Sequence, residues 1–137
     1  MQKRIIMTAA DIERLEQLLE ATSHRADHAG LAALGRELDR AEIVAADEVS
    51  TNIVTMNSRV LLHDLDRDME FVCSIVFPAE ANADQEKISV LSPLGTALLG
   101  YAVGHVVCFS APGGPRRVKI KALEYQPEAA NRERSAA

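Results

Sequence analysis

The stretch Leu91-Ser92-Pro93-Leu94-Gly95-Thr96-Ala97-Leu98-Leu99-Gly100 lies between two strand-like runs and predicts a short helix over residues 94–99. Ser92 is a residue type that caps helix N-termini, and Pro93 fits the first helical position because its φ is already set. Gly100 suits the left-handed conformation beyond the last turn. The leucines of this helix can belong to the core or form a docking surface, and the sequence leaves both interpretations open.

The chain on both sides of this stretch predicts a largely antiparallel β region. Runs of β-branched and aromatic residues alternate there with polar turns. In the last run, Val118 and Ile120 are expected to face the core, while the basic residues between them line the outside. The predicted strands are residues 59–63 paired with 69–77, residues 88–91, and residues 105–110 paired with 116–123 around Gly113 and Gly114.

Helical spacing dominates the chain before residue 49. Thr8 is expected to cap a first helix, with Asp11 in a capping-box-like arrangement, and this helix ends near Thr22. The second helix contains Gly30 and Gly35, each of which costs about 1 kcal/mol relative to alanine, so we expect the two helices to lean on the rest of the chain. At ~1.5 Å per residue the arms are about 20 to 30 Å long. The apolar stripes are Ile12, Leu15, Leu19 and Thr22, then Leu31, Leu34, Leu38, Ala41 and Ala45.

The composition is that of a small globular protein, and the charge favours a protein as its binding partner. The chain has 137 residues, of which 47% are hydrophobic and 26% charged, enough to build a core. Its net charge is −5, whereas a nucleic-acid binder usually carries an excess of basic residues. No apolar run approaches the roughly 18 residues of a membrane span, and the first residues lack a signal-peptide core. We therefore expect a cytoplasmic protein that binds neither nucleic acid nor membranes.

Side chains that carry chemistry form no recognisable site in the sequence. Cys73 and Cys108 have apolar neighbours and are expected to be reduced, buried core residues. His24 and His28 are four residues apart, but no glutamate stands between them as in the H-E-x-x-H zinc motif. The sequence therefore predicts no metal, no cofactor and no catalytic residue.

Several motifs carry a resemblance to one family. The segments "KISVLSPLGTALLG" (residues 87–100), "VG" (103–104), "PGG" (112–114) and "ALEY" (122–125) resemble the Gre transcript-cleavage factors of bacterial RNA polymerase. The segments "ELDRAEIV" (37–44), "VTMNSRV" (54–60) and "EYQPE" (124–128) are similar to the regulator of nucleoside diphosphate kinase family, a short-hairpin relative of Gre. The similarity covers nearly all of residues 5–128.

The resemblance implies an α+β fold in three parts. Residues 1–48 are expected to form an antiparallel helical hairpin, a short coiled coil. Residues 49–126 are expected to form an FKBP-like antiparallel β domain with one short helix. Residues 127–137 are expected to be a flexible tail, because alanine and charged residues dominate there without an apolar period.

The same resemblance implies a protein that binds bacterial RNA polymerase beside its secondary channel. The implied contact residues are Leu91, Ser92, Pro93, Leu94 and Thr96, at the start of the predicted short helix. Two alternatives stay open at this point. One is an FKBP-like prolyl isomerase, although only 4% of the residues are aromatic and able to line a proline pocket. The other is a direct modulator of nucleoside diphosphate kinase.

The predicted hairpin tip contains His24, Arg25, Asp27 and His28. Gre factors are understood to stimulate transcript cleavage by bringing paired acidic residues of a long hairpin to the polymerase active site, where carboxylates help to hold a second Mg²⁺. Asp27 alone is a poor ligand set, and the predicted arms are short. The resemblance thus implies a monomer that occupies the channel entrance without cleaving transcripts and competes with Gre factors.

Overall fold

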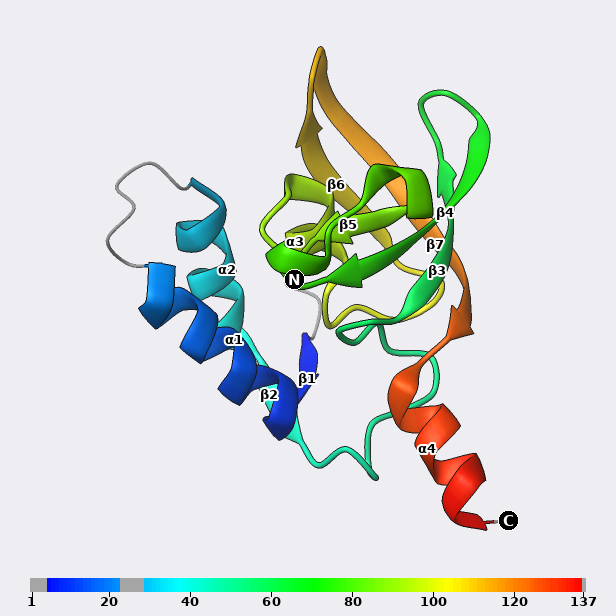
Figure 1. The fold of residues 1–137 in the computed structure, drawn as a ribbon. Coiled ribbons are helices and arrows are strands. Elements are labelled where there is room, and N and C mark those ends of the chain that lie inside the picture. Colours follow the sequence, from blue (N-terminus) through cyan, green and yellow to red (C-terminus); the bar gives the residue numbers. More distant parts are fainter. Residues whose placement is uncertain (1–4, 23–28, 137) are drawn as a thin grey trace.

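The computed structural model describes residues 5–22 and 29–136 as a mixed α+β fold in which two helices lie beside a curled sheet (Figure 1). The fold class agrees with the sequence prediction, whereas the FKBP-like and coiled-coil descriptions stay predictions. The elements are β1 Ile6–Thr8, α1 Ala9–Thr22, α2 Ala29–Arg40, β2 Glu42–Val44, β3 Arg59–Asp64, β4 Met69–Val76, β5 Lys87–Ser89, α3 Pro93–Leu98, β6 Val106–Ala111, β7 Gly114–Tyr125 and α4 Pro127–Ala136, with short 3-10 turns at Pro78–Glu80 and Ala83–Gln85.

The sheet has five strands in the order β5-β4-β3-β7-β6. The two predicted hairpins, β3 with β4 and β6 with β7, are antiparallel as expected. Val118 and Ile120 are fully buried, which confirms the inward face of β7. The prediction for residues 88–91 was wrong in extent, because β5 ends at Ser89, where the chain turns toward α3. This short strand pairs with β4 in parallel.

The predicted short helix is confirmed as α3. The Ser92 Oγ accepts a hydrogen bond from the Gly95 N–H at 3.1 Å and donates one to the Ser89 carbonyl at 2.7 Å. Pro93 occupies the first turn, and Gly100 follows the helix with a φ of 87°. These local signals fix both ends of α3.

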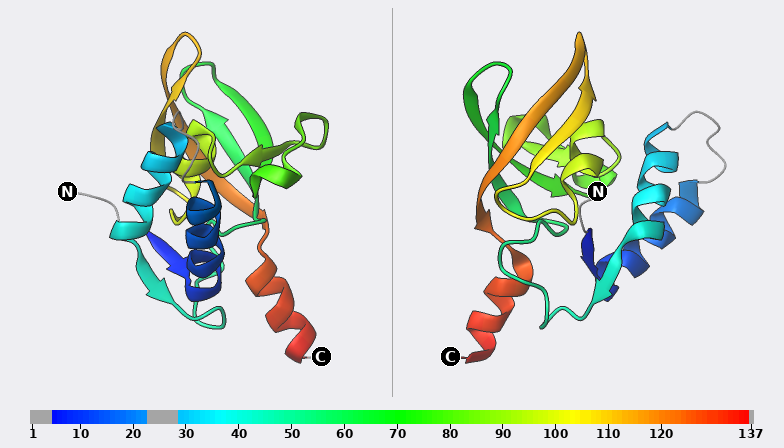
Figure 2. Two further views of the ribbon diagram at one scale, coloured as in Figure 1. Left: turned by 60° about the vertical axis from the view of Figure 1, so that its left-hand side comes forward. Right: turned by 180° about the vertical axis from the view of Figure 1, so that it is seen from behind.

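The helices α1 and α2 run in opposite directions beside the sheet (Figures 1 and 2). Thr8 caps α1, since its Oγ1 accepts the Asp11 N–H at 3.1 Å. The capping-box prediction needs a correction at the acid, because the Asp11 carboxylate accepts the Met56 N–H at 3.1 Å. It thereby joins α1 to the segment that leads into β3.

The second helix is shorter than its apolar stripe predicts. It ends at Arg40, so Ala41 and Ala45 lie outside it. The next residues form β2, which pairs in parallel with β1. The Glu42 N–H donates to the Ile5 carbonyl at 2.8 Å at the start of this pairing. Alanine is the best helix former, so the two alanines extended the apparent stripe past the residue where the pairing of β2 with β1 ends the helix.

The last residues form helix α4, where the sequence predicted a tail without regular structure (Figure 2). Gln126 is 4% exposed, and its Nε2 donates to the Ser50 and Ile53 carbonyls at 2.9 and 2.8 Å. Thr55 donates from its hydroxyl to Glu128 at 2.7 Å. Contacts with a distant part of the chain therefore hold a segment that has little apolar patterning of its own.

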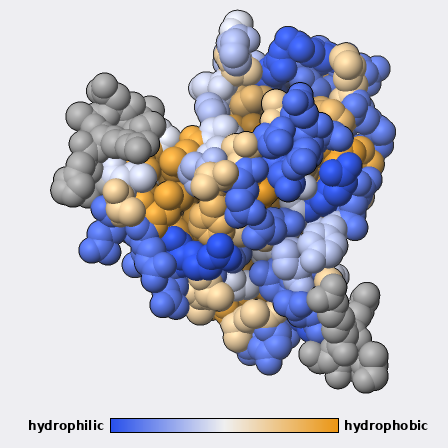
Figure 3. All heavy atoms as spheres, in the orientation of Figure 1, coloured by the Kyte–Doolittle hydropathy of each residue, from blue (hydrophilic) through white to orange (hydrophobic). Residues whose placement is uncertain are grey.

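One hydrophobic core joins the helical part to the sheet. Leu15 on α1 and Leu34 on α2 are fully buried in the same cluster as Leu62, Leu98 and Ile120 of the β region. Apolar side chains also reach the surface between α2 and α3 (Figure 3). Among the described helices, none is both long and apolar enough to cross a membrane.

Candidate functional site

The five predicted contact residues come from the start of α3 and the turn before it. Pro93 is exposed, and Leu91, Ser92 and Leu94 are half-buried. Thr96 is only 7% exposed, and its Oγ1 donates to the Val90 carbonyl at 2.6 Å. The hydroxyls of Ser92 and Thr96 are thus both used inside this segment. What this end of α3 offers to a partner is apolar surface.

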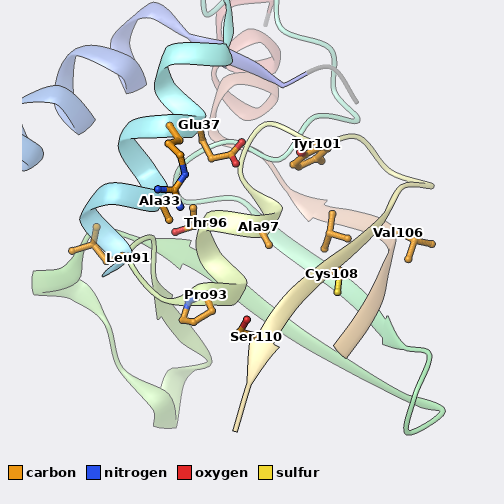
Figure 4. A pocket seen from close by; sticks show the side chains of 13 residues that line it. Ala33, Glu37, Leu91, Pro93, Thr96, Ala97, Tyr101, Val106, Cys108 and Ser110 are labelled. Carbon is orange, nitrogen blue, oxygen red and sulfur yellow. The ribbon is translucent and has the colours of Figure 1, made fainter. Parts of the chain in front are cut away.

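A groove of about 600 Å³ opens beside this end of α3 (Figure 4). Helix α3 provides its floor, α2 lines one side, and β6 lines the other side. The sequence did not reveal this groove, because its walls lie more than sixty residues apart in the chain. Its lining includes Gly30, Ala33, Arg36, Glu37, Leu91, Pro93, Thr96, Ala97, Tyr101, Val106, Cys108 and Ser110.

Gly30 explains how closely α2 approaches the predicted contact segment. A Cβ atom at this position would lie 2.4 Å from the Leu91 carbonyl oxygen. No real Cβ tolerates such a distance, so α2 can rest against this turn only with glycine there. Gly35, on the same helix, has no atom within 4 Å of its own Cβ position. Close contact with Leu91 at Gly30 is therefore one way in which the helices depend on the rest of the chain, as predicted.

The two cysteines have different environments. Cys73 is buried as predicted, and burial raises the pKa of its thiol to about 12. Cys108 is exposed and lines the groove, so the prediction of a core residue was wrong there. It stands opposite Arg117 in the β6–β7 pairing, on the face that carries basic residues. Its apolar neighbours in sequence, Val106 and Val107, could not indicate that face.

Two basic residues on the outer face of β7, Arg117 and Lys121, are engaged with acidic residues. The Arg117 N–H donates to Asp66 at 2.8 Å, and its guanidinium lies 3.3 Å from the same carboxylate. These contacts, the backbone hydrogen bond first, lower the pKa of Asp66. Lys121 forms an ion pair with Glu70 and lowers the pKa of that carboxyl in the same way. This face is a network of surface ion pairs.

Asp11 is a buried acid that sequence reasoning treated only as part of a helix cap. It is 8% exposed. Burial raises its pKa to about 6, although the hydrogen bond from Met56 opposes that rise. Nothing in its chain neighbours indicates this, because the burial comes from packing against the segment before β3.

The predicted hairpin tip, with His24, Arg25, Asp27 and His28, lies outside the described residues. Within residues 5–22 and 29–136, no three His, Cys, Asp or Glu side chains gather in a group that would hold a metal ion.

Comparisons with known proteins agree over most of the chain. Residues 49–125 match the family "Transcription elongation factor, GreA/GreB, C-term", and residues 3–44 match the family "Rnk N-terminus". The "Regulator of nucleoside diphosphate kinase" of Escherichia coli K12 is 40% identical over 130 residues, which are 92% of this chain and 93% of that protein. The GreA elongation factor of Chloroherpeton thalassium is 39% identical over 66% of this chain and 57% of its own length.

Solved structures show the same similarity. The structure "Prokaryotic transcription elongation factor GreA/GreB from Nitrosomonas europaea" has a TM-score of 0.76 and 41% identity, and the match covers 89% of this chain and all of that chain. The GreA factor homolog 1 of Thermus thermophilus has a TM-score of 0.50 and 29% identity over 90% of this chain. The relatives are named as regulators or transcription factors.

Proposed function

This chain belongs to the regulator of nucleoside diphosphate kinase family, with a C-terminal part of the GreA/GreB type, and from that premise we propose that it is a non-enzymatic regulator that binds RNA polymerase. It docks near the secondary channel and does not stimulate transcript cleavage. The match of residues 49–125 to the elongation-factor family is the observation that carries this proposal. The regulator name of the relatives fits an effect on nucleoside diphosphate kinase that is exerted through transcription.

The docking surface is the exposed start of α3. Pro93 and Leu94 offer apolar area there, while the hydroxyl of Ser92 is used as a helix cap. Apolar residues that a partner fully desolvates are the usual source of affinity in an interface. The contact residues on this surface are therefore Leu91, Pro93 and Leu94, whereas the hydroxyls of Ser92 and Thr96 are used inside the segment.

The size and charge of the helical part support the proposed lack of cleavage. Helix α1 has 14 residues and α2 has 12, so at ~1.5 Å per residue each arm is only about 20 Å long. The sequence between them contains a single carboxylate, Asp27. A second catalytic Mg²⁺ needs several oxygen ligands from the protein or substrate. This hairpin is too short and too poorly supplied with acids for that role.

Binding and cleavage can be tested with purified bacterial RNA polymerase. Pro93→Ala combined with Leu94→Ala is expected to weaken binding at least about tenfold, a loss of hot-spot size. Ser92→Ala is the matched control, which lowers stability by about 1 kcal/mol but leaves affinity nearly unchanged. Equal affinities of all three proteins, each shown to be folded by circular dichroism, would remove the docking surface from the proposal.

The cleavage experiment uses backtracked elongation complexes with Mg²⁺ and an RNA labelled at its 5′ end. We expect no shortening of the RNA when this protein is added in excess, and slower cleavage when a Gre factor is present with it. Shortening stimulated by this protein alone contradicts the proposal. Adding purified nucleoside diphosphate kinase in place of polymerase tests direct modulation of the kinase, and a tight complex with the kinase but not with polymerase would favour that alternative.

A further inference from the structure

Polar contacts near its start hold helix α4 on the protein. Figures 1 and 2 show this helix extending away from the sheet after β7. The Arg132 Nη2 donates to the Ala46 carbonyl at 2.8 Å and also to the Val49 carbonyl, and the Thr55 hydroxyl donates to Glu128. Among the α4 side chains that the structure describes, those of residues 127–132, none belongs to the hydrophobic core. Movement of α4 therefore leaves that core intact.

The docking of α4 is incomplete in two respects. The Gln126 Oε1 and the Arg132 Nε are buried and have no hydrogen-bond partner among the described residues, and such an atom costs stability because it gives up a hydrogen bond to water. A cavity of about 630 Å³ also lies between α4, Ala10 at the start of α1, and Asp47. A modest change in energy at this interface is therefore enough to shift the position of α4.

Two carboxyl groups meet at the base of α4. The Asp11 carboxylate of α1 accepts the Met56 N–H at 3.1 Å, and the Glu128 carboxylate of α4 accepts the Thr55 hydroxyl at 2.7 Å. Residues 55 and 56 are consecutive, so the two acids are bound to the same short stretch of backbone. Asp11 is buried, and water therefore screens a charge on it poorly.

The charges that act on Asp11 come from two helices. Burial raises the pKa of Asp11 to about 6, Glu128 of α4 adds to that rise, and Arg14 of α1 opposes it. The segment before β3 contributes an uncharged backbone N–H and the Thr55 hydroxyl. Arg132 of α4 is engaged with backbone carbonyls instead. The charge that α4 brings against Asp11 is therefore negative.

We propose that α4 is a pH-dependent switch, which docks firmly on the start of α1 while Asp11 is protonated and is released when Asp11 ionises. The ionised carboxyl would lie in a poorly hydrated place with Glu128 bound to the neighbouring residue. Release of α4 separates the two charges and lets water reach Asp11. By linkage, a docked helix that tightens proton binding is itself docked more tightly by the proton.

The pKa of Asp11 limits the size of the effect. The rise from 3.8 to about 6 corresponds to about a hundredfold change in the docking equilibrium if α4 caused all of it. Helix α1 and the segment before β3 cause part of the burial. We therefore expect the ratio of docked to released α4 to fall about three- to tenfold as the pH rises from about 5 to about 7.5.

NMR of the isotope-labelled full chain follows the acid and the helix in one titration. The chemical shift of the Asp11 carboxyl carbon reports its protonation. The solvent exchange of the amides of residues 130–132, corrected for the intrinsic rate at each pH, reports the opening of α4. In the wild type, these amides should lose protection with the same midpoint as Asp11, near pH 6. Clearly different midpoints would contradict the proposal.

Three variants assign the response to this pair of acids. Asp11→Asn keeps an acceptor for the Met56 N–H and cannot ionise, so α4 should stay equally protected from pH 5 to 7.5. Glu128→Gln keeps an acceptor for the Thr55 hydroxyl and removes the opposing charge, so it should lower the pKa of Asp11 and reduce the pH response of α4. Asp47→Asn is the matched control, because Asp47 is an exposed acid of the same cavity, and it should behave like the wild type.

Circular dichroism shows whether each variant is folded. The proposal fails if the wild-type amides of α4 keep the same protection throughout this pH range, or if their pH response persists in Asp11→Asn. If Asp11→Asn does not fold, Glu128→Gln decides, and an unchanged titration of Asp11 in that variant overturns the proposal. None of these measurements involves polymerase, so the outcome is independent of the proposed function.

Discussion

At the scale of single residues, burial rather than chain neighbours decides the chemistry. Asp11 and Cys108 are two opposite examples. Asp11, an acid in the first turn of a helix, is buried, whereas Cys108, a cysteine that follows two valines, is exposed. The Met56 segment that covers Asp11 comes from elsewhere in the chain, and the pairing of Cys108 with Arg117 of β7 determines the face on which that cysteine lies. The burial of Asp11 should make the stability of the protein depend on pH.

Asp11 should make the protein less stable as the pH rises. Its pKa is about 6 in the folded protein and 3.8 in the unfolded chain, so the folded state binds the proton more tightly between these values. The free energy of unfolding therefore falls as the pH increases from about 4 to about 7, by on the order of 2 kcal/mol from this group. Asp11→Asn keeps an acceptor for the Met56 N–H and should remove that decline.

Urea unfolding at a series of pH values measures this effect. Asp39→Asn is the control, because Asp39 is an exposed acid on α2. If Asp11→Asn and Asp39→Asn show the same pH dependence as the wild type, Asp11 is not the buried acid that the structure describes.

At the scale of elements, close backbone contact between α2 and the start of α3 holds the helical part on the sheet. Gly30 makes that contact possible, whereas Gly35 faces open space. The two glycines have the same intrinsic cost within a helix. Their different surroundings make them a matched pair for measuring this contact.

Gly35→Ala should stabilise the protein by about 0.5–1 kcal/mol, since alanine favours the helix and meets nothing. Gly30→Ala should destabilise it by about 1–3 kcal/mol, because its Cβ would collide with the Leu91 carbonyl and α2 would have to move. Thermal unfolding of both variants against the wild type is the measurement. Stabilisation by both substitutions would show that α2 does not rest on this turn.

At the scale of the whole molecule, the helical part and the sheet share one core. Leu34 of α2 and Ile75 of β4 are both fully buried members of it. Small domains with one core usually unfold in a single cooperative transition. The division at residues 48 and 126 stays a prediction, but a shared core implies that neither part unfolds alone.

Leu34→Ala should therefore weaken the sheet as well as the helices. Loss of a buried leucine side chain costs about 2–5 kcal/mol. Circular dichroism at the helical signal follows α1 and α2, and the alkylation rate of Cys73 follows the opening of β4 in the sheet. Both probes should shift to the same lower urea midpoint. Helices that melt while Cys73 stays protected would indicate two independent units.

The sequence by itself determined the features that depend on near neighbours. Ser92, Pro93 and Gly100 define α3 through a cap, a preset φ and a left-handed residue, and all three act within one turn of the chain. Gly113 and Gly114 have positive φ in the turn between β6 and β7 in the same way. The family resemblance rested on these same segments.

Only the tertiary structure decided the features that depend on distant partners. The β1–β2 pair has three residues in each strand, too few for a periodic pattern, and it forms because the fold brings the two segments together. Helix α4 depends on contacts of Gln126 with residues more than seventy positions away. The groove and the exposed Cys108 arise because α2 packs beside α3 and β6. A sequence pattern records which residues prefer burial, but not which surfaces meet, since that is set by contacts across the whole chain.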